Sequence, residues 1–228
     1  MRNKPFIFFD LDDTLLNHTV AQERGVKEIH KKYFRHFPYM EFEKVWMKHA
    51  QKYWKLYEQK KLSFIEQRIK RFIATWKELG KPISVNKAKD IVNEYAALYE
   101  FFWKPFPKVV STIKKLHQRG FPLGILTNGS TPKQLKKLKK LKLNQYFKAD
   151  FIITSETSGF SKPEKEIYLH AESLIRTSGS NVIFIRNDIF TDLETAKNIG
   201  WEVILFDYFN RFPDNSSVKR FQDILQLI

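Results

Sequence analysis

The 228-residue sequence contains no cysteine. This absence excludes disulfide bonds, thiolate metal ligands and cysteine nucleophiles, and it fits a reducing compartment. Glycine is also scarce, with 8 residues, and no glycine-rich RNA-binding signature is present. The chemistry of cysteine sulfur is therefore not available to this chain.

The sequence also lacks long apolar runs. No stretch approaches the roughly 18 uninterrupted apolar residues of a membrane-spanning helix. The first residues, Met1-Arg2-Asn3-Lys4, lead directly into a strand-like run that carries carboxylates, unlike the apolar segment of a signal peptide. Hydrophobic residues make up 43% of the chain, with 21 Phe and 5 Trp, which is ample material for a core. We expect a globular, cytoplasmic protein with no membrane partner.

Basic residues outnumber acidic ones, giving a formal net charge of +15. Such a charge raises the question of a polyanionic partner. In the lysine-rich stretch 133–142, Leu135, Leu138 and Leu141 recur every three residues, which predicts an amphipathic helix whose lysines face water. We therefore expect a solvated helix face rather than a nucleic-acid site. The positive field would still attract small phosphorylated substrates.

Residues 6–15 form an apolar run that ends in three carboxylates. The run from Phe6 to Phe9 predicts a strand buried on both faces, as in a parallel α/β sheet. Asp10 and Asp12 are two residues apart, so they point the same way where that strand ends. They would repel each other unless a cation neutralised them, and Mg²⁺ binds one or two carboxylates plus phosphate oxygens. An exposed turn with a helix N-cap is the alternative, and this stretch alone leaves both open.

Helical patterns occupy the next part of the chain. Residues 41–59 and 86–102 predict helices, and Ser63-Phe64-Ile65-Glu66 is a capping box that opens a third. The aromatic residues of this helical part of the chain are expected to form a core, among them Trp46, Trp54, Phe72 and Trp76. From residue 105 onward strands and helices alternate, which is typical of βαβ units. We predict an α/β protein: a Rossmann-like parallel sheet core of residues 1–16 and 101–228, with an inserted all-helical cap domain of residues 17–100.

Polar residues follow the predicted strands. They are Asp10 and Asp12, Thr127 and Asn128, Lys162, and finally Asn187, Asp188 and Asp192. Each has a plain structural explanation as a strand-end hydroxyl, a turn, a solvated charge or an N-cap. Because the carboxyl ends of parallel strands converge, four such coincidences favour a common site. The set supplies a carboxylate nucleophile, an acid/base, a hydroxyl, an ammonium and metal-binding carboxylates.

These residues resemble the motifs of the haloacid dehalogenase-like hydrolases. The similar stretches are 10–15 (DLDDTL), 126–129 (LTNG), 159–163 (GFSKP), and 187–188 with 192–200. The resemblance implies that Asp10 attacks phosphorus and becomes an aspartyl-phosphate, while Asp12 protonates the leaving alcohol and then activates water. Thr127 and Lys162 would hold the phosphoryl group of a small phosphorylated metabolite. Mg²⁺ would be bound by Asp10, the backbone carbonyl of Asp12 and the fourth motif, and the helical insertion resembles the family's mobile cap.

Within that family, the insertion and the Thr-Asn-Gly motif resemble the bacterial pyrimidine 5′-nucleotidase branch. This resemblance implies nucleoside monophosphates as substrates. Residues 61–72 are similar to a cap pattern in which an Arg precedes a Phe, which makes Arg71 a candidate substrate-binding residue. A solvated helix charge is the alternative for Arg71. Asp12 favours a phosphatase, because dehalogenases of this superfamily lack an acid at that position.

The fourth motif departs from the family pattern. Counting back from Asp192, the usual Gly-Asp pair falls on Arg186-Asn187, so an amide replaces the metal-binding carboxylate. Either Asn187 binds the metal through its carbonyl oxygen, or a shift of one residue gives that role to Asp188. The ungapped downstream match favours Asn187, with weak Mg²⁺ affinity that Arg186 would weaken further.

Two other functions remain open from the sequence. One is a catalytically impaired phosphoryl-binding or signalling protein on the same fold, which the altered fourth motif favours. The other is a basic nucleic-acid-binding module, whose retention on RNA or DNA would depend on salt.

Overall fold

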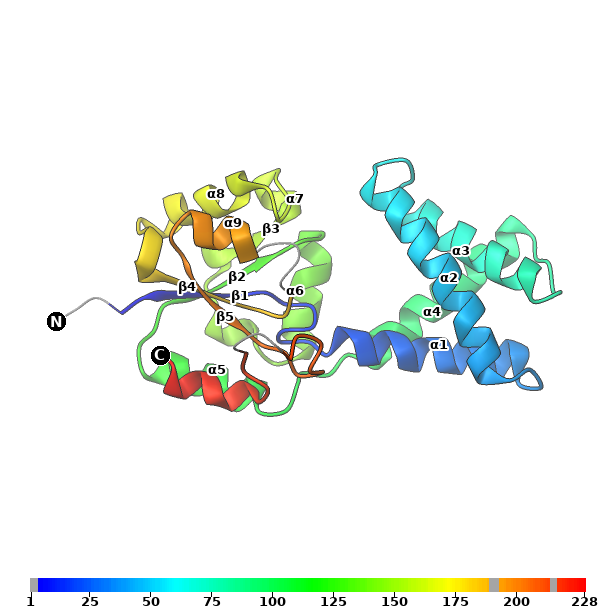
Figure 1. Ribbon diagram of the computed structural model, residues 1–228, viewed down its shortest axis with the longest axis horizontal. Helices are drawn as coiled ribbons and strands as arrows, with labels where there is room; N and C mark the ends of the chain where they lie inside the picture. Colours follow the sequence, from blue (N-terminus) through cyan, green and yellow to red (C-terminus); the bar gives the residue numbers. More distant parts are fainter. Residues whose placement is uncertain (1–3, 189–192, 214–216) are drawn as a thin grey trace. The chain divides into compact units, whose positions relative to one another are not determined.

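The computed structural model describes residues 4–188, 193–213 and 217–228 (Figure 1). The chain divides into two compact units: Met1–His18 with Trp103–Ile228, and Thr19–Phe102. These bounds lie two residues from the predicted bounds of the helical insertion. Within the described ranges, no helix is both long enough and apolar enough to cross a lipid bilayer.

The first unit is built on a five-stranded parallel sheet. Its strand order is β3-β2-β1-β4-β5, where the strands are β1 (Phe6–Phe9), β2 (Leu123–Thr127), β3 (Ile152–Thr154), β4 (Val182–Arg186) and β5 (Glu202–Leu205). Strand β1 lies at the centre, paired in parallel with β2 on one side and β4 on the other. The predicted α/β class with a parallel sheet is confirmed.

Helices cover both faces of this sheet (Figure 1). On one face, Phe8 and Phe184 pack with Tyr168 and Trp201 in a cluster that also includes residues of α8 (Lys165–Ile175) and α9 (Leu193–Asn198). On the other face, Phe9 contacts Phe147 and Phe221, which lies in the 3₁₀ helix η4 (Phe221–Gln226) beside α5 (Val109–Gln118). Coverage of both faces explains why the central strands are apolar without alternation.

The remaining helical elements of this unit lie in the connections. They are α6 (Thr131–Lys140), η1 (Asn144–Tyr146), η2 (Ala149–Phe151), α7 (Ser155–Ser158) and η3 (Gly179–Asn181). Helix α6 follows β2 directly, so its first turn starts close to the carboxyl end of that strand.

Gly124 fixes how closely β1 and β2 approach. It pairs in register with Phe8. A Cβ atom at position 124 would lie 2.5 Å from the Phe8 ring and 2.9 Å from the Phe6 ring, which is closer than real Cβ contacts allow. The aromatic rings of β1 therefore occupy the space that a side chain on β2 would need.

The second unit consists of α-helices. They are α1 (His18–Phe34), which begins at the boundary, α2 (Tyr39–Glu58), α3 (Phe64–Glu78) and α4 (Val85–Phe101). Trp46, Phe72 and Trp76 are buried and in ring contact, as predicted for a core, and Phe42 packs with them. Trp54 is 44% exposed, so its prediction as a packing residue is wrong. Its indole instead donates to Glu58 one turn later on α2.

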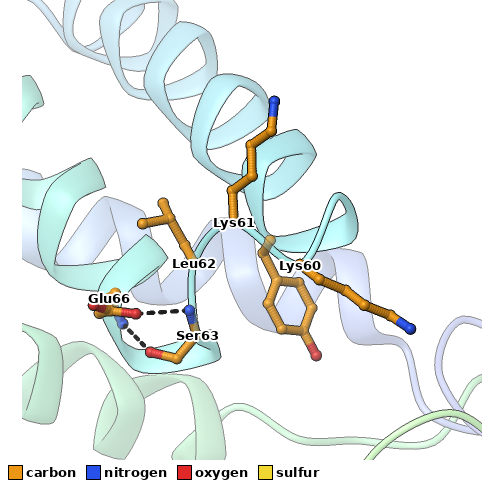
Figure 2. A pocket seen from close by; sticks show the side chains of 6 residues that line it. Lys60, Lys61, Leu62, Ser63 and Glu66 are labelled. Atoms are coloured by element: carbon orange, nitrogen blue, oxygen red, sulfur yellow. Dashed lines mark hydrogen bonds between the residues drawn. The ribbon is translucent and has the colours of Figure 1, made fainter.

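The predicted capping box of α3 is present (Figure 2). Glu66 N donates to Ser63 Oγ at 3.2 Å, and Ser63 N donates to Glu66 Oε2 at 2.8 Å. Two backbone N–H groups that would otherwise lack partners are thus satisfied, which contributes about 1 kcal/mol. The turn before α3 also lines an open pocket of about 410 Å³ with Tyr57, Lys60 and Lys61.

Asp207 anchors the chain after β5. Its carboxylate is fully buried, accepts hydrogen bonds from Arg211 N and Phe212 N, and pairs with Lys219 Nζ at 2.7 Å. Burial by itself would raise the pKa of this carboxyl, but Lys219 and the two backbone donors outweigh burial and lower the pKa below 3.8. The ionised form is the one that the fold stabilises.

Asp207→Asn should destabilise the protein at neutral pH by about 2 kcal/mol, because buried donors lose a charged acceptor. Since the folded pKa is depressed, this stabilisation is complete above the unfolded pKa and is lost as pH falls through the folded pKa. The variant should therefore lose less stability than wild type on acidification below about pH 4. Urea unfolding at neutral and acid pH measures both effects.

Asp223→Asn, which removes a surface pair with Arg220, is the control and should cost under about 1 kcal/mol. An equal acid sensitivity in Asp207→Asn and wild type would contradict the assignment.

Candidate active site

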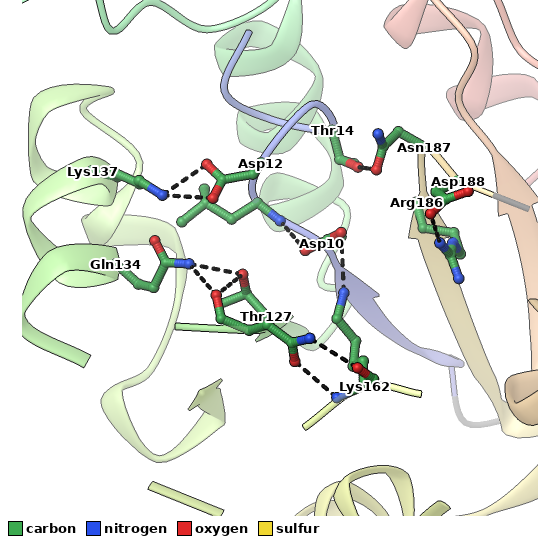
Figure 3. A network of polar contacts seen from close by, with 12 residues as sticks. Asp10, Asp12, Thr14, Thr127, Gln134, Lys137, Lys162, Arg186, Asn187 and Asp188 are labelled. Carbon is green, nitrogen blue, oxygen red and sulfur yellow. Dashed lines mark hydrogen bonds and ion pairs between the residues drawn. The ribbon is translucent and has the colours of Figure 1, made fainter. Parts of the chain in front are cut away.

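Asp10 lies at the carboxyl end of the central strand (Figure 3). Its backbone N–H donates to Ile185 O of β4, and its Oδ1 accepts from Leu11 N at 2.7 Å. Its Oδ2 lies 3.0 Å from Lys162 Nζ. The Lys162 ammonium is also 5.2 Å from the centre of the Phe184 ring, and the residue is only 7% exposed. The structure thus brings together the predicted nucleophile and the predicted ammonium.

Asp12 is paired with a lysine that the sequence did not single out. Lys137 Nζ lies 2.8 Å from Asp12 Oδ1 and 2.6 Å from Oδ2 (Figure 3). His18 Nδ1 lies 3.6 Å from the same carboxylate. Burial would raise the pKa of Asp12, but Lys137 and then His18 outweigh it, so the pKa lies below its ordinary value. Asp12 is therefore held as a carboxylate.

The prediction that the lysines of residues 133–142 face water is wrong for Lys137, which is 3% exposed. The buried stripe of α6 is formed by Gln134, Lys137 and Leu138, with Leu141 buried at the C-cap, and Leu135 is exposed instead. Helical spacing allows this stripe as readily as one through Leu135, because residues three and four apart share a face. On this side of α6, Lys137 meets the carboxylate of Asp12.

Two loops are joined by hydrogen bonds through Asn128. Its Nδ2 donates to Lys162 O at 2.9 Å, and Lys162 N donates to Asn128 Oδ1 at 2.8 Å. Gln134 Nε2 donates to Thr127 Oγ1 at 3.0 Å and to Asn128 O at 2.7 Å. Thr127, Asn128 and Lys162 are therefore brought together as predicted, with Asn128 acting on the Lys162 backbone. Gln134 was missed, although it stands four residues before Leu138 on the same helix face.

The fourth motif lies at the end of β4 (Figure 3). Asn187 is 9% exposed, and its Oδ1 accepts from Thr14 Oγ1 of the first motif at 3.4 Å, which is a long hydrogen bond. Arg186 is 1% exposed, and its Nη2 lies 3.8 Å from Asp188 Oδ2. Asn187 thus contacts the first motif, while Asp188 pairs with Arg186. Asp192 lies outside the described residues.

Arg71 belongs to the helical unit, where it is 9% exposed. Its guanidinium lies 4.5 Å above the Trp46 ring and 5.7 Å from the centre of the Tyr95 ring. Burial lowers the pKa of Arg71 to about 10, with Tyr95 acting in the opposite direction. The alternative of a solvated helix charge is wrong, because aromatic rings cover this side chain. Its role in substrate binding stays a prediction.

The residues of the α/β unit only partly suit a magnesium ion. The oxygens of Asp10, Asp12, Asn187 and Asp188 are the hard donors that Mg²⁺ prefers. Each of the three carboxylates is already paired with a cation of the protein, at distances of 2.6 to 3.8 Å. Among the residues that the structure describes, no group of three or more His, Asp or Glu is placed to hold a metal ion. Within the described part of the site, these paired charges do not fit a tightly bound divalent cation.

Comparison with known proteins gives relatives of similar length. A glyceraldehyde 3-phosphate phosphatase of Pyrococcus abyssi is 23% identical over 230 residues, covering 97% of this chain and 92% of the relative. A ribulose-1,5-bisphosphate 5-phosphatase of Halopiger xanaduensis is 29% identical over 118 residues, covering 49% of this chain and 48% of the relative. A crystal structure described as the HAD-hydrolase YfnB from Bacillus subtilis bound to magnesium has a TM-score of 0.77 and 22% identity, with 99% of both chains covered.

The family model described as haloacid dehalogenase-like hydrolase matches residues 6–200. This range begins at the first residue of β1 and extends past α9, so it includes every segment that contributes to the site. The chain belongs to the haloacid dehalogenase-like hydrolases.

Proposed function

We propose that this chain is a phosphomonoester hydrolase whose nucleophile is Asp10. The observation that carries the proposal is the 3.0 Å contact between the Asp10 carboxylate and the Lys162 ammonium, with Asp12 two residues away. An ammonium in this position attracts a phosphoryl group to the carboxylate and offsets charge that develops in the transition state. The names of the relatives from Pyrococcus abyssi and Halopiger xanaduensis support phosphatase activity.

The proposed reaction has two steps. In the first, an Asp10 oxygen attacks phosphorus, the bond from phosphorus to the alcohol oxygen breaks, and a proton on Asp12 passes to the leaving oxygen. In the second, water attacks phosphorus, Asp12 accepts its proton, and the bond between phosphorus and Asp10 breaks. The carboxylate form of Asp12, which Lys137 stabilises, is the form that the second step needs. Delivery of a proton by Asp12 in the first step stays a prediction.

The proposed substrate is a small phosphorylated metabolite. The resemblance to the pyrimidine 5′-nucleotidase branch predicts nucleoside monophosphates, whereas the names of the relatives favour short phosphorylated sugars. The resemblance also predicts Mg²⁺ as cofactor, and the YfnB structure is described as bound to magnesium. A panel of both ester classes, assayed with Mg²⁺ and with a chelator, tests substrate and cofactor together. If no ester turns over in either buffer, the phosphoryl-binding alternative replaces the hydrolase proposal.

Asp10→Asn should abolish turnover of the best ester in that panel while the thermal unfolding midpoint changes little. The reason is that an amide oxygen is too weak a nucleophile to form the phosphoryl intermediate. Asp13→Asn is the matched control, because it removes the third carboxylate of the same loop and should retain activity. Undiminished hydrolysis by purified Asp10→Asn would show that covalent catalysis through Asp10 is wrong.

Asn128→Ala should reduce kcat/KM about tenfold, because the Lys162 backbone loses two hydrogen bonds and its ammonium loses a fixed position. Asn128→Asp keeps the acceptor for Lys162 N but places a carboxylate oxygen against Lys162 O and adds a negative charge, so its loss should be at least as large. Asn198→Ala, at an exposed position of α9, is the control and should match wild type. Steady-state kinetics with one ester distinguishes the three, and a wild-type value for Asn128→Ala would show that the contact does not position Lys162.

Arg71→Met should raise KM for a nucleoside monophosphate or sugar phosphate and leave a small generic ester unaffected. This change removes the guanidinium but keeps an apolar stem against Trp46. Lys70→Met, at an exposed position of the same helix, is the matched control. An unchanged ranking of substrates in Arg71→Met would limit Arg71 to packing within the helical unit.

A further inference from the structure

Three of the site's carboxylates that the structure describes each lie beside a cation of the protein. Asp10 pairs with Lys162, Asp12 with Lys137, and Asp188 with Arg186 (Figure 3). The formal charges of these side chains cancel. The family resemblance accounts for only one of the cations, Lys162 of the third motif. Lys137 comes from α6, and Arg186 occupies the position where the family pattern has glycine.

Both additional cations are buried. Lys137 is 3% exposed and Arg186 is 1% exposed, so solvent screens their charges poorly. Arg186 and Lys162 approach the same ring, with their charged ends 6.0 Å and 5.2 Å from the centre of Phe184. Both charged ends therefore lie near one ring of β4, and the Arg186 charge acts on an ion bound at the end of that strand.

A divalent cation and a phosphate group respond to this arrangement in opposite ways. Each buried positive charge repels Mg²⁺ with twice the energy of a monovalent ion at the same distance, while Asn187 adds no compensating negative charge. The same charges attract the phosphoryl dianion and stabilise the charge that develops on its oxygens. The site is thus better suited to an anion than to a divalent cation.

We propose that Lys137 and Arg186 replace the divalent cation as charge partners of this site, so that the chain holds a phosphoryl group without bound Mg²⁺. The proposal rests on the proposed function, since it concerns the phosphoryl group that Asp10 would attack. Lys137 contacts Asp12 directly, whereas Arg186 pairs with Asp188 at the end of β4. Both are assigned as electrostatic substitutes for a metal ion.

Calorimetric titration of the full chain with Mg²⁺ tests the repulsion directly. Wild type should bind Mg²⁺ with a dissociation constant above about 1 mM. Lys137→Met and Arg186→Gln should each tighten binding about tenfold, because each removes one buried positive charge. Lys139→Met removes an exposed charge from the same helix and should leave the dissociation constant unchanged. Asn187→Asp should tighten binding as well, since it adds a carboxylate where the family pattern has one.

Titration with inorganic phosphate tests the attraction. The phosphate affinity of wild type in the presence of a chelator should lie within about threefold of its phosphate affinity in Mg²⁺. Lys137→Met should weaken the phosphate affinity measured with chelator about tenfold. Thermal unfolding establishes that each variant is folded. If the buried Arg186→Gln change prevents folding, Lys137→Met alone still decides the test. This variant should fold because methionine gives α6 a side chain of similar length.

Three results would overturn the inference: Mg²⁺ binding by wild type tighter than about 1 mM, unchanged Mg²⁺ affinity in the neutral variants, or phosphate binding that requires Mg²⁺. Its failure can be distinguished from failure of the proposed function. Tight Mg²⁺ binding with ester turnover would reject the inference alone. Phosphate binding in chelator without turnover of any ester would reject the hydrolase alone.

Discussion

The repulsion between carboxylates at the end of β1 is the constraint on which the rest of the site depends. The chain runs from β1 through β2 to β3 at one edge of the sheet and then crosses to β4 on the other side of β1, so Asp10 lies at the topological switch point where ligands bind in such folds. Asp10 and Asp12 follow the end of this strand, two residues apart. Ionised together, they need positive charge close by.

That charge comes from three separate segments of the chain. Lys162 comes from the loop before α8, Lys137 from α6, and Arg186 from the end of β4. Two of these segments are held by further hydrogen bonds: the Lys162 backbone by Asn128, and the first turns of α6 by Gln134 hydrogen bonds to the end of β2. The carboxylates and cations are thus positioned by the sheet and by its connecting loops together.

Much of the fold and part of the site could be predicted from the sequence. The strand β1 was recognisable because burial on both faces leaves an apolar run, and Ser63 was recognisable as a cap because the capping box is a local pattern. Lys137 could not be predicted, since α6 carries several lysines and local periodicity does not say which one meets a carboxylate more than a hundred residues away. The covering of Arg71 by Trp46 and Tyr95 likewise depends on packing between helices α2, α3 and α4.

Gly124 leaves the space between β1 and β2 that the rings of Phe6 and Phe8 occupy. Because the two rings occupy the space beside position 124, no residue with a Cβ fits there while both rings remain. The residues at the three positions are therefore coupled during evolution. A lineage in which both Phe6 and Phe8 become smaller can accept alanine at position 124, whereas one that keeps both rings in place must keep glycine. Aligned relatives should show this covariation even though none of the three residues takes part in the chemistry.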